Sequence, residues 1–137
     1  MDIGPLISDQ VLSVGPQECL ADAARKMHER RVGSAVVIAD DGSPGILTER
    51  DVLRAVAEGA DPQSTHVEGY MTPQAITASL TWDAIEAGRR LISGGFRHLI
   101  VVDEEGSVAG VLSIRDLLRG LLDTMPQEAG AGASTTT

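Results

Sequence analysis

Amphipathic helical segments alternate with short apolar runs along this chain. Apolar residues spaced at i, i+3, i+4 and i+7 predict a helix that begins near Pro16 to Glu18. The face that this helix would bury consists of Leu20, Ala23, Ala24 and Met27. A later helix is expected to begin at Thr81, a suitable N-cap, with Asp83 in its first turn, where a carboxylate favours the helix dipole.

Each of these helices precedes a predicted hairpin. Residues 35–38 and 99–102 are apolar at consecutive positions, which is typical of a strand covered on both faces. Turn-forming residues follow each run, and residues 45–47 and 108–112 complete the hairpins. A further helix closes each half, and we expect it to bury Val52, Leu53, Val56 and Ala57 in the first half and Leu117, Leu118, Leu121 and Leu122 in the second.

The two halves are copies of one unit. A shift of 64 residues places residues 34–42 over 98–106, and after a one-residue insertion a shift of 65 places residues 45–53 over 110–118. The fold class predicted is α+β, built from tandem repeats that each hold a small sheet and two helices. We assign residues 1–62 to the first repeat and 63–125 to the second, as one compact pair, joined by a polar linker. Residues 126–137 form a low-complexity tail that we expect to be disordered.

Composition and charge exclude several classes of protein for this chain. Hydrophobic residues make up 42% and aromatic residues 2% of the 137, so the interior must be aliphatic. A formal net charge of −9 makes a nucleic acid an unexpected partner. A single cysteine excludes an internal disulfide, and no segment resembles a signal peptide or a membrane span, so we expect a cytoplasmic protein.

The residue types that usually carry catalysis are poorly placed. Neither His28 nor His66 has a partner at metal-ligand spacing, and no general base can be named for Cys19. Glycine-rich phosphate loops of the Walker or dinucleotide type are absent from the sequence. We therefore expect no enzyme, no metal and no cofactor.

Two phrases in register carry a family resemblance. Gly45-Ile46-Leu47-Thr48-Glu49-Arg50-Asp51 and Gly110-Val111-Leu112-Ser113-Ile114-Arg115-Asp116 resemble the ribose-binding signature of cystathionine-β-synthase (CBS) domains. Met71-Thr72-Pro73 resembles the phrase that opens many such repeats, and Ile7-Ser8-Asp9 is its weaker counterpart. The resemblance covers roughly residues 6–123 and identifies the chain as a CBS pair, or Bateman module.

The resemblance implies that the repeats pack about a pseudo-twofold axis and leave two clefts that hold adenosine compounds. The ligand expected is AMP, ADP or ATP, with S-adenosylmethionine as a further candidate. The family pattern assigns to the first cleft Ile46, Thr48, Arg50, Asp51, Ala75, Ile76, Thr77, Phe96, Arg97 and His98. It assigns to the second cleft Val11, Leu12, Ser13, Val32, Gly33, Ser34, Val111, Ser113, Arg115 and Asp116.

The chemistry of these residues suits a nucleotide. Asp51 or Asp116 can accept hydrogen bonds from ribose hydroxyls, and Thr48 or Ser113 can donate to a phosphate near a helix N-terminus. The apolar side chains in each signature would face the adenine. The two cleft assignments differ in charge, because Arg97 and His98 align with Gly33 and Ser34, so we expect the first cleft to be the tighter phosphate site.

Simpler roles remain open for the same residues. Asp51 and Asp116 could only cap helices, Arg50 and Arg115 could be solvated or paired with nearby acids, and His98 could lie at the edge of the core. The function expected is regulatory: the chain binds a nucleotide and signals to a separate, unidentified effector protein. The alternative is a structural dimerisation scaffold with empty or vestigial clefts. A homodimer is expected in either case, through surplus apolar surface on Leu117, Leu118, Leu121, Leu122 and Met125.

Overall fold

Each half of the chain folds into a three-stranded sheet with two helices against it, which confirms the α+β prediction. The computed structural model describes residues 1–8 and 10–126, so the tail expected to be disordered lies almost wholly outside the described residues. The first half contains β1 (Ser13–Val14), α1 (Leu20–Arg30), β2 (Ser34–Ile38), β3 (Pro44–Thr48) and α2 (Glu49–Ala57). The second half contains β4 (Thr77–Ser79), α3 (Ala84–Gly94), β5 (His98–Val102), β6 (Val108–Ser113) and α4 (Ile114–Asp123). Short 3₁₀ helices, η1 (Gly4–Leu6) and η2 (Val67–Gly69), lie ahead of each half.

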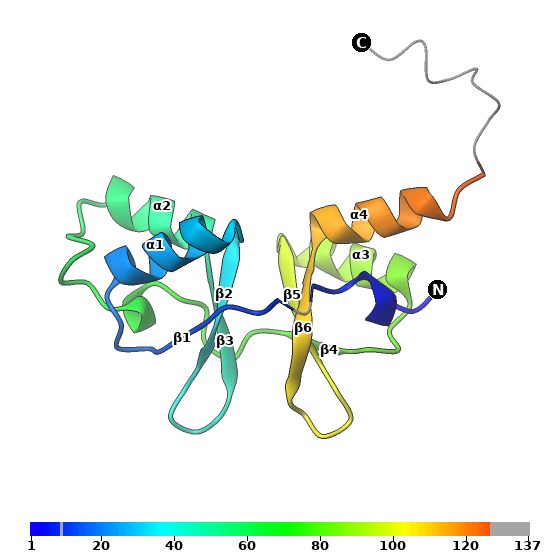
Figure 1. Cartoon of the computed structure of the whole chain (residues 1–137), viewed down its shortest axis with the longest axis horizontal. Coiled ribbons are helices and arrows are strands. Elements are labelled where there is room, and N and C mark those ends of the chain that lie inside the picture. Colours follow the sequence, from blue (N-terminus) through cyan, green and yellow to red (C-terminus); the bar gives the residue numbers. More distant parts are fainter. Residues whose placement is uncertain (9, 127–137) are drawn as a thin grey trace, which may run out of the picture.

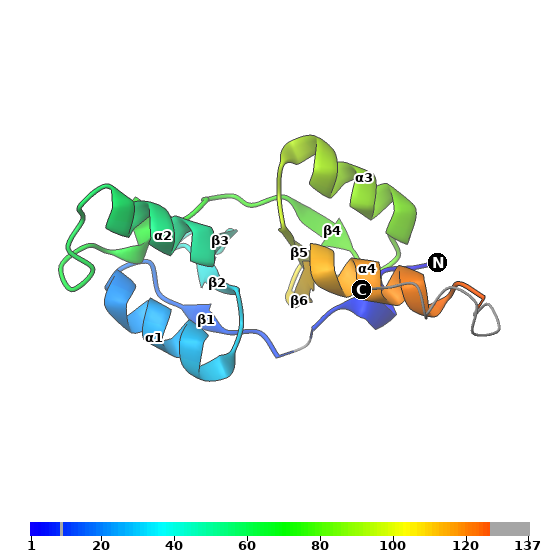
Figure 2. The same cartoon turned by 90° about the horizontal axis from the view of Figure 1, so that it is seen from above.

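The two sheets have the same topology. β1 runs parallel to β2 and β2 runs antiparallel to β3, and β4, β5 and β6 repeat this arrangement. The helices lie on one side of the molecule, and the tips of the two hairpins extend from the opposite side (Figure 1). Seen from the helix side, α1 lies beside α2, and α3 beside α4 (Figure 2).

Alternation along β2 explains why this strand is buried on both faces. Ala35 and Val37 face the helices and join a core with Leu20 and Leu47. Val36 points the other way and packs against Ile46 and Ile100 of the two repeats. Residues 35–37 therefore serve two layers at once, as the sequence predicted, whereas Ile38 at the end of the strand is exposed.

The start of each first helix differs from the prediction. α1 begins at Leu20 after Cys19, slightly later than expected. α3 begins at Ala84, and its N-cap is Asp83 rather than Thr81. The Asp83 carboxylate accepts hydrogen bonds from the backbone N–H groups of Ile85 and Glu86 at 3.1 and 3.3 Å, so it satisfies two otherwise unpaired donors.

The prediction for the closing helices was wrong in part. Ala55 and Leu117 are buried, and Val52 and Leu121 pack at the edges of the two cores. Five of the expected core side chains are instead exposed. The exposed fractions are 68% for Leu53, 57% for Val56, 58% for Leu118 and 56% for Leu122, and Ala57 is exposed as well. In a two-layer repeat, the outer side of a helix has no second layer to pack against. We call Leu53, Val56, Leu118, Leu122 and Met125 the outer helical face.

The segment that leads into each repeat is attached to the other repeat. Ser8 exchanges backbone hydrogen bonds of 3.0 and 3.1 Å with Val111 in β6. Thr72 exchanges bonds of 3.0 and 2.9 Å with Ile46 in β3. Ile3 is fully buried in the core of the second repeat, and Val67 is fully buried in that of the first. The repeats are thus tied together by two crossed segments.

A glycine allows each crossed segment to approach its strand. A Cβ atom on Gly45 would lie 2.7 Å from the Thr72 carbonyl oxygen and 2.9 Å from Cε of Met71. A Cβ atom on Gly110 would lie 2.5 Å from the Ser8 carbonyl oxygen. The glycine that opens each signature phrase is therefore a packing requirement of the crossed segments.

Within residues 1–8 and 10–126, none of the helices combines the length and apolar character needed to cross a bilayer.

Replacing Gly45 with Ala is expected to lower the free energy of unfolding by about 1–3 kcal/mol, because the methyl group must displace the Thr72 backbone. Urea unfolding followed by circular dichroism measures this loss. Gly69→Ala is the matched control, since a Cβ atom there has no neighbour within 4 Å. Equal stability of the two variants would show that the close approach at Gly45 is not tight.

Candidate functional site

Two clefts lie where the repeats meet. The smaller has a volume of about 350 Å³ and is formed by β3 and the start of α2 with the end of α3 and β5. The larger has a volume of about 1240 Å³ and is formed by the end of α1 and β2 with the end of β6 and the start of α4. Each cleft therefore combines the signature phrase of one repeat with the segment after the first helix of the other repeat.

The smaller cleft brings together all the residues assigned to the first site except Thr77, which pairs with Ile100 inside the second sheet. It is also lined by residues that the sequence analysis did not assign to it, namely Glu49, Thr72, Gln74, Gly95 and Ile100. Its charged groups balance, because Arg50 and Arg97 stand against Glu49 and Asp51.

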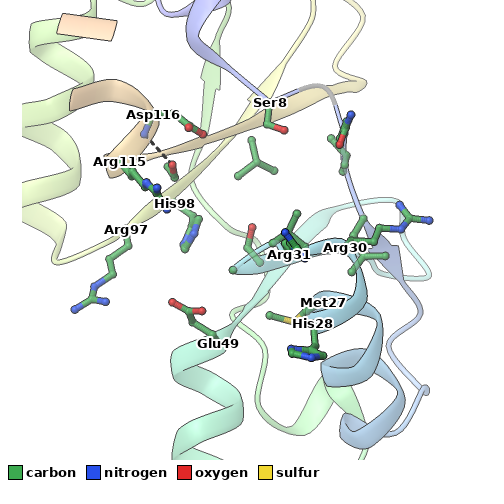
Figure 3. A pocket seen from close by; sticks show the side chains of 18 of the residues that line it. Ser8, Met27, His28, Arg30, Arg31, Glu49, Arg97, His98, Arg115 and Asp116 are labelled. Atoms are coloured by element: carbon green, nitrogen blue, oxygen red, sulfur yellow. Dashed lines mark hydrogen bonds between the residues drawn. The ribbon is translucent and has the colours of Figure 1, made fainter. Parts of the chain in front are cut away.

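The larger cleft brings together all the residues assigned to the second site except Ser13. Many further residues line it: Ser8, Gln10, Ala24, Met27, His28, Glu29, Arg30, Arg31, Glu49, Val52, Arg97, His98, Ile114 and Arg119. The expectation that the first cleft is the tighter phosphate site rested on Arg115 as the one cation assigned to this second cleft, whereas Arg30, Arg31, Arg97 and Arg119 also line it. Figure 3 shows Arg30 and Arg31 on the wall from the first repeat, with Arg97 and Arg115 on the wall from the second.

A signal for two of these missed arginines was present in the duplication. The 64-residue shift aligns Arg30 and Arg31 with Gly94 and Gly95, so the copies differ in charge at the end of the first helix. The residues that the sequence analysis assigned to this wall of the cleft start only at Val32, just after these two arginines. Arg97 lines both clefts, a position that the sequence alone could not show.

The carboxylate of Asp51 serves as part of a helix cap. Its Oδ2 atom accepts hydrogen bonds from the backbone N–H of Thr48 at 2.8 Å and from Thr48 Oγ1 at 3.0 Å. The backbone N–H of Asp51 in turn donates to Thr48 Oγ1 at 3.3 Å, which completes a capping box. The capping alternative is thus realised at Asp51, and only Oδ1 remains free of these bonds.

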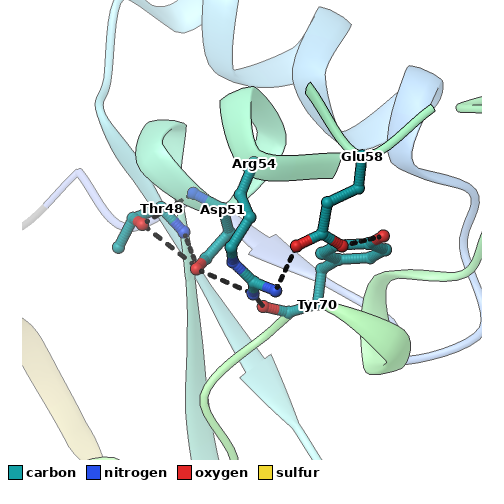
Figure 4. A network of polar contacts seen from close by, with 5 residues as sticks. All are labelled: Thr48, Asp51, Arg54, Glu58 and Tyr70. Carbon is teal, nitrogen blue, oxygen red and sulfur yellow. Dashed lines mark hydrogen bonds and ion pairs between the residues drawn. The ribbon is translucent and has the colours of Figure 1, made fainter. Parts of the chain in front are cut away.

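Arg54 connects this cap to Tyr70, the residue that follows η2 (Figure 4). One of its nitrogens lies 3.6 Å from Asp51 Oδ1 and donates to the Tyr70 carbonyl oxygen at 3.1 Å. The guanidinium lies 4.7 Å from the centre of the Tyr70 ring. The Tyr70 hydroxyl donates to Glu58 at 2.9 Å, and this bond raises the pKa of Tyr70. Asp51 is therefore held in a polar network on the first repeat.

The corresponding carboxylate in the second repeat is freer. The backbone N–H of Asp116 donates to Ser113 Oγ at 3.0 Å, so Ser113 caps α4. In the described part of the chain no group donates a hydrogen bond to the Asp116 carboxylate, and its closest cation is Arg119 at 3.7 Å. The Asp116 side chain is 29% exposed against 14% for Asp51. Asp116 is consequently the better placed of the two to accept hydrogen bonds from a ligand.

His98 stands on the wall shared by the two clefts. Its Nδ1 atom is buried and has no hydrogen-bond partner among the described residues. Burial lowers the pKa of His98, Arg97 acts in the same direction, and Glu49 and Asp116 oppose the shift. Burial therefore favours the neutral imidazole on the wall between the clefts.

The described part of the chain shows no candidate metal site. Among residues 1–8 and 10–126, no group of three or more His, Cys, Asp and Glu side chains is arranged to hold a metal ion. Cys19 is half-buried at the N-cap of α1.

Comparison with known proteins decides the family. The CBS domain model matches residues 2–58 and again residues 67–123. The chain belongs to the CBS domain family. Its two CBS repeats confirm the resemblance found in the signature phrases.

Relatives of this CBS pair include proteins with little known of their function. An uncharacterized 17.7 kDa protein from Acidianus ambivalens is 36% identical over 132 residues, which cover 96% of this chain and 79% of the relative. An uncharacterized conserved protein from Pyrococcus horikoshii has a crystal structure with a TM-score of 0.78 at 32% identity, covering 93% and 95% of the two chains. This chain spans about a quarter of the length of several CBS domain-containing proteins from Arabidopsis thaliana.

One similar CBS protein was solved with a nucleotide. The structure of the CBS domain protein PAE2072 from Pyrobaculum aerophilum, complexed with AMP, has a TM-score of 0.78 at 29% identity. The match covers 90% of this chain and 99% of that one.

Different losses of stability are expected when the two signature carboxylates are removed. Asp51→Ala should lower the free energy of unfolding by about 1 kcal/mol, because it removes half of a capping box. Asp116→Ala should cost under roughly 0.5 kcal/mol, because Ser113 still caps α4. Urea unfolding of both variants without ligand measures the difference, and a reversed order would contradict the assignment of Asp51 to the cap.

Proposed function

We propose that this CBS pair is a non-catalytic regulatory module that binds an adenine nucleotide between its repeats. The observation that carries the proposal is the position of the Ser113 and Asp116 side chains, at the N-terminus of α4 on the wall of the larger cleft. The AMP complex of a CBS protein at 29% identity supports the same chemistry.

The residues around Asp116 suit the parts of a nucleotide. The exposed carboxylate can accept hydrogen bonds from the two ribose hydroxyls. The first turn of α4 offers backbone N–H groups and the positive end of the helix dipole to a phosphate, with Arg115 beside it. Val11 and Val111 give an apolar surface on which a base can pack.

AMP, ADP and ATP are the proposed ligands, and S-adenosylmethionine is a further candidate for the same cleft. Regulation would require the ligand to bind two conformations of the pair, or of its complex with an effector protein, with different affinities. Adenine nucleotides are cytoplasmic metabolites, so the proposal places the protein in that compartment. A structural scaffold with empty clefts is the alternative.

Binding of an adenine nucleotide should raise the melting temperature, because a ligand that binds only the folded state stabilises it by mass action. We expect Asp116→Ala to weaken binding at least about tenfold in isothermal titration calorimetry, through loss of a charged hydrogen-bond acceptor. Asp123→Ala, an exposed carboxylate at the far end of α4, is the matched control. If AMP, ADP, ATP, S-adenosylmethionine and NADH all leave the melting temperature unchanged, the scaffold alternative is favoured.

The outer helical face supports a homodimer as part of this proposal. Its residues come from α2, from α4 and from the turn just after α4. Figure 2 views the molecule from the side on which these helices lie. Monomeric proteins rarely leave a large apolar patch open to water, and a second copy can cover the patch about a twofold axis. Leu121, by contrast, packs against the core of the second repeat and is a poor probe of this interface.

Replacing Leu118 with Glu should convert the dimer to a monomer without loss of folding, because the side chain is already 58% exposed in one copy. Light scattering at micromolar concentration measures the mass. Ile38→Glu, an exposed position at the hairpin end of β2, should leave the dimer intact. A wild-type monomer, or a Leu118→Glu variant that remains dimeric, would argue against this interface.

A further inference from the structure

The two clefts differ sharply in charge, although the repeats that form them are copies. Five arginines line the larger cleft, at positions 30, 31, 97, 115 and 119, together with the carboxylates of Glu29, Glu49 and Asp116. The smaller cleft is lined by two arginines and two carboxylates. A surplus of positive charge has thus collected in one cavity of a chain whose formal net charge is −9. This contrast suits a ligand with several negative charges.

Most of these arginines are not neutralised within the protein. Arg119 lies 3.7 Å from Asp116, and Glu29 lies 3.8 Å from Arg25, outside the cleft. Across the described residues, the arginines at 30, 31, 97 and 115 have no carboxylate oxygen within 4.0 Å. Guanidinium groups that share a cavity repel one another, and a bound polyanion removes that repulsion while gaining bidentate hydrogen bonds.

The backbone at Arg31 gives a second, independent indication. Arg31 ends α1 in the left-handed conformation, with φ 56° and ψ 43°. The equivalent residue at the end of α3 is Gly95, with φ 69°, and glycine adopts this conformation without steric cost. The turn therefore needs no arginine, and a residue held in an unfavourable conformation beside a cleft is typical of a ligand site.

Arg30 and Arg31 also counteract the repulsion that the C-terminus of α1 would exert on a bound anion. They stand at the C-terminus of α1, where the helix dipole places partial negative charge that disfavours an anion. Two guanidinium groups at that point oppose this negative charge. The wall from the first repeat can then face phosphates that extend from the opposite wall, where α4 begins.

We propose that the larger cleft binds a nucleotide with an extended phosphate chain, such as a nucleoside triphosphate, through Arg30 and Arg31. This inference rests on the proposed function and specifies the ligand class of one cleft. Asp116 and Ser113 hold the ribose and first phosphate, and the outer phosphates cross to the wall formed by α1. A volume of about 1240 Å³ accommodates this longer ligand, and the smaller cleft, at about 350 Å³ and balanced in charge, suits a nucleoside or a monophosphate.

The decisive variant is Arg31→Gly, because it removes the guanidinium and restores the residue that the duplicated turn already uses. Isothermal titration of the full chain with adenosine, AMP, ATP and inorganic tripolyphosphate gives the affinities. We expect the wild-type protein to bind ATP at least about tenfold tighter than AMP, since each charge-assisted contact is worth roughly that factor. Arg31→Gly should weaken ATP about tenfold and AMP less than about twofold. It should not lower the melting temperature.

The control is Arg89→Ala, which removes the same charge from an exposed position on α3 that lines neither cleft. Its affinity for ATP should stay within about twofold of the wild-type value. Added salt should weaken ATP binding more steeply in the wild type than in Arg31→Gly. Arg30→Ala is a second variant with the same expected direction, should Arg31→Gly fail to fold. Tripolyphosphate should compete with ATP in the wild type and lose affinity in Arg31→Gly.

Two negative results can be told apart. If ATP and AMP bind equally well and neither Arg31→Gly nor Arg30→Ala changes this, the polyphosphate assignment is overturned and nucleotide binding stands. If adenosine, AMP and ATP all fail to bind the wild-type chain, the proposed function is wrong and this inference fails with it, even if tripolyphosphate alone still binds.

Discussion

The crossed backbone pairing is the constraint on which the rest of this structure depends. Two hydrogen bonds fix Ser8 to Val111, and two more fix Thr72 to Ile46. These bonds hold each leading segment across the other repeat, so that Val36, Ile46 and Ile100 close a shared apolar layer between the sheets. The walls of both clefts are set by that layer, because each cleft takes one wall from each repeat. The backbone pairing therefore helps to position the binding residues, because the paired residues themselves line the clefts: Ser8 and Val111 the larger, Ile46 and Thr72 the smaller.

The sequence predicted the features that local pattern determines. Both hairpins followed from apolar runs and turn residues that recur in the two copies, and both cleft assignments followed from the resemblance of the signature phrases to CBS domains. The closing helices were harder to predict, because an apolar residue such as Leu53 or Leu118 is buried only if another element covers it. The spacing of those side chains does not distinguish a helix face that packs against a sheet from one that stays exposed in a single copy of the chain. The N-cap of α3 was misplaced for a similar reason, since Thr81 and Asp83 are both good caps and only the path of the chain selects one.

At the candidate site the limits of sequence reasoning are different in kind. The signature residues line the clefts to which the sequence assigned them, but the balance of charge was judged from too few positions. Arg97 contributes to both cavities and Arg31 to the larger one, and these facts depend on the tertiary arrangement. Asp51 and Asp116 occupy equivalent positions in two similar phrases, yet one is bound in a capping box and the other is free to accept a ligand. Duplicated motifs can therefore diverge in role while their sequences stay alike.

The burial of Ile3 has a consequence for synthesis on the ribosome. The backbone N–H of Ile3 donates to the Trp82 carbonyl oxygen at 2.9 Å, and that of Gly4 donates to Leu80 at 3.0 Å. These partners belong to the second repeat and are translated after the first. The hydrogen bonds of the first few residues can therefore form only once the second repeat emerges, and contacts of such wide sequence separation slow folding. The nascent chain can form the helices and hairpin of its first half early, but its folding can be completed only once both copies are present.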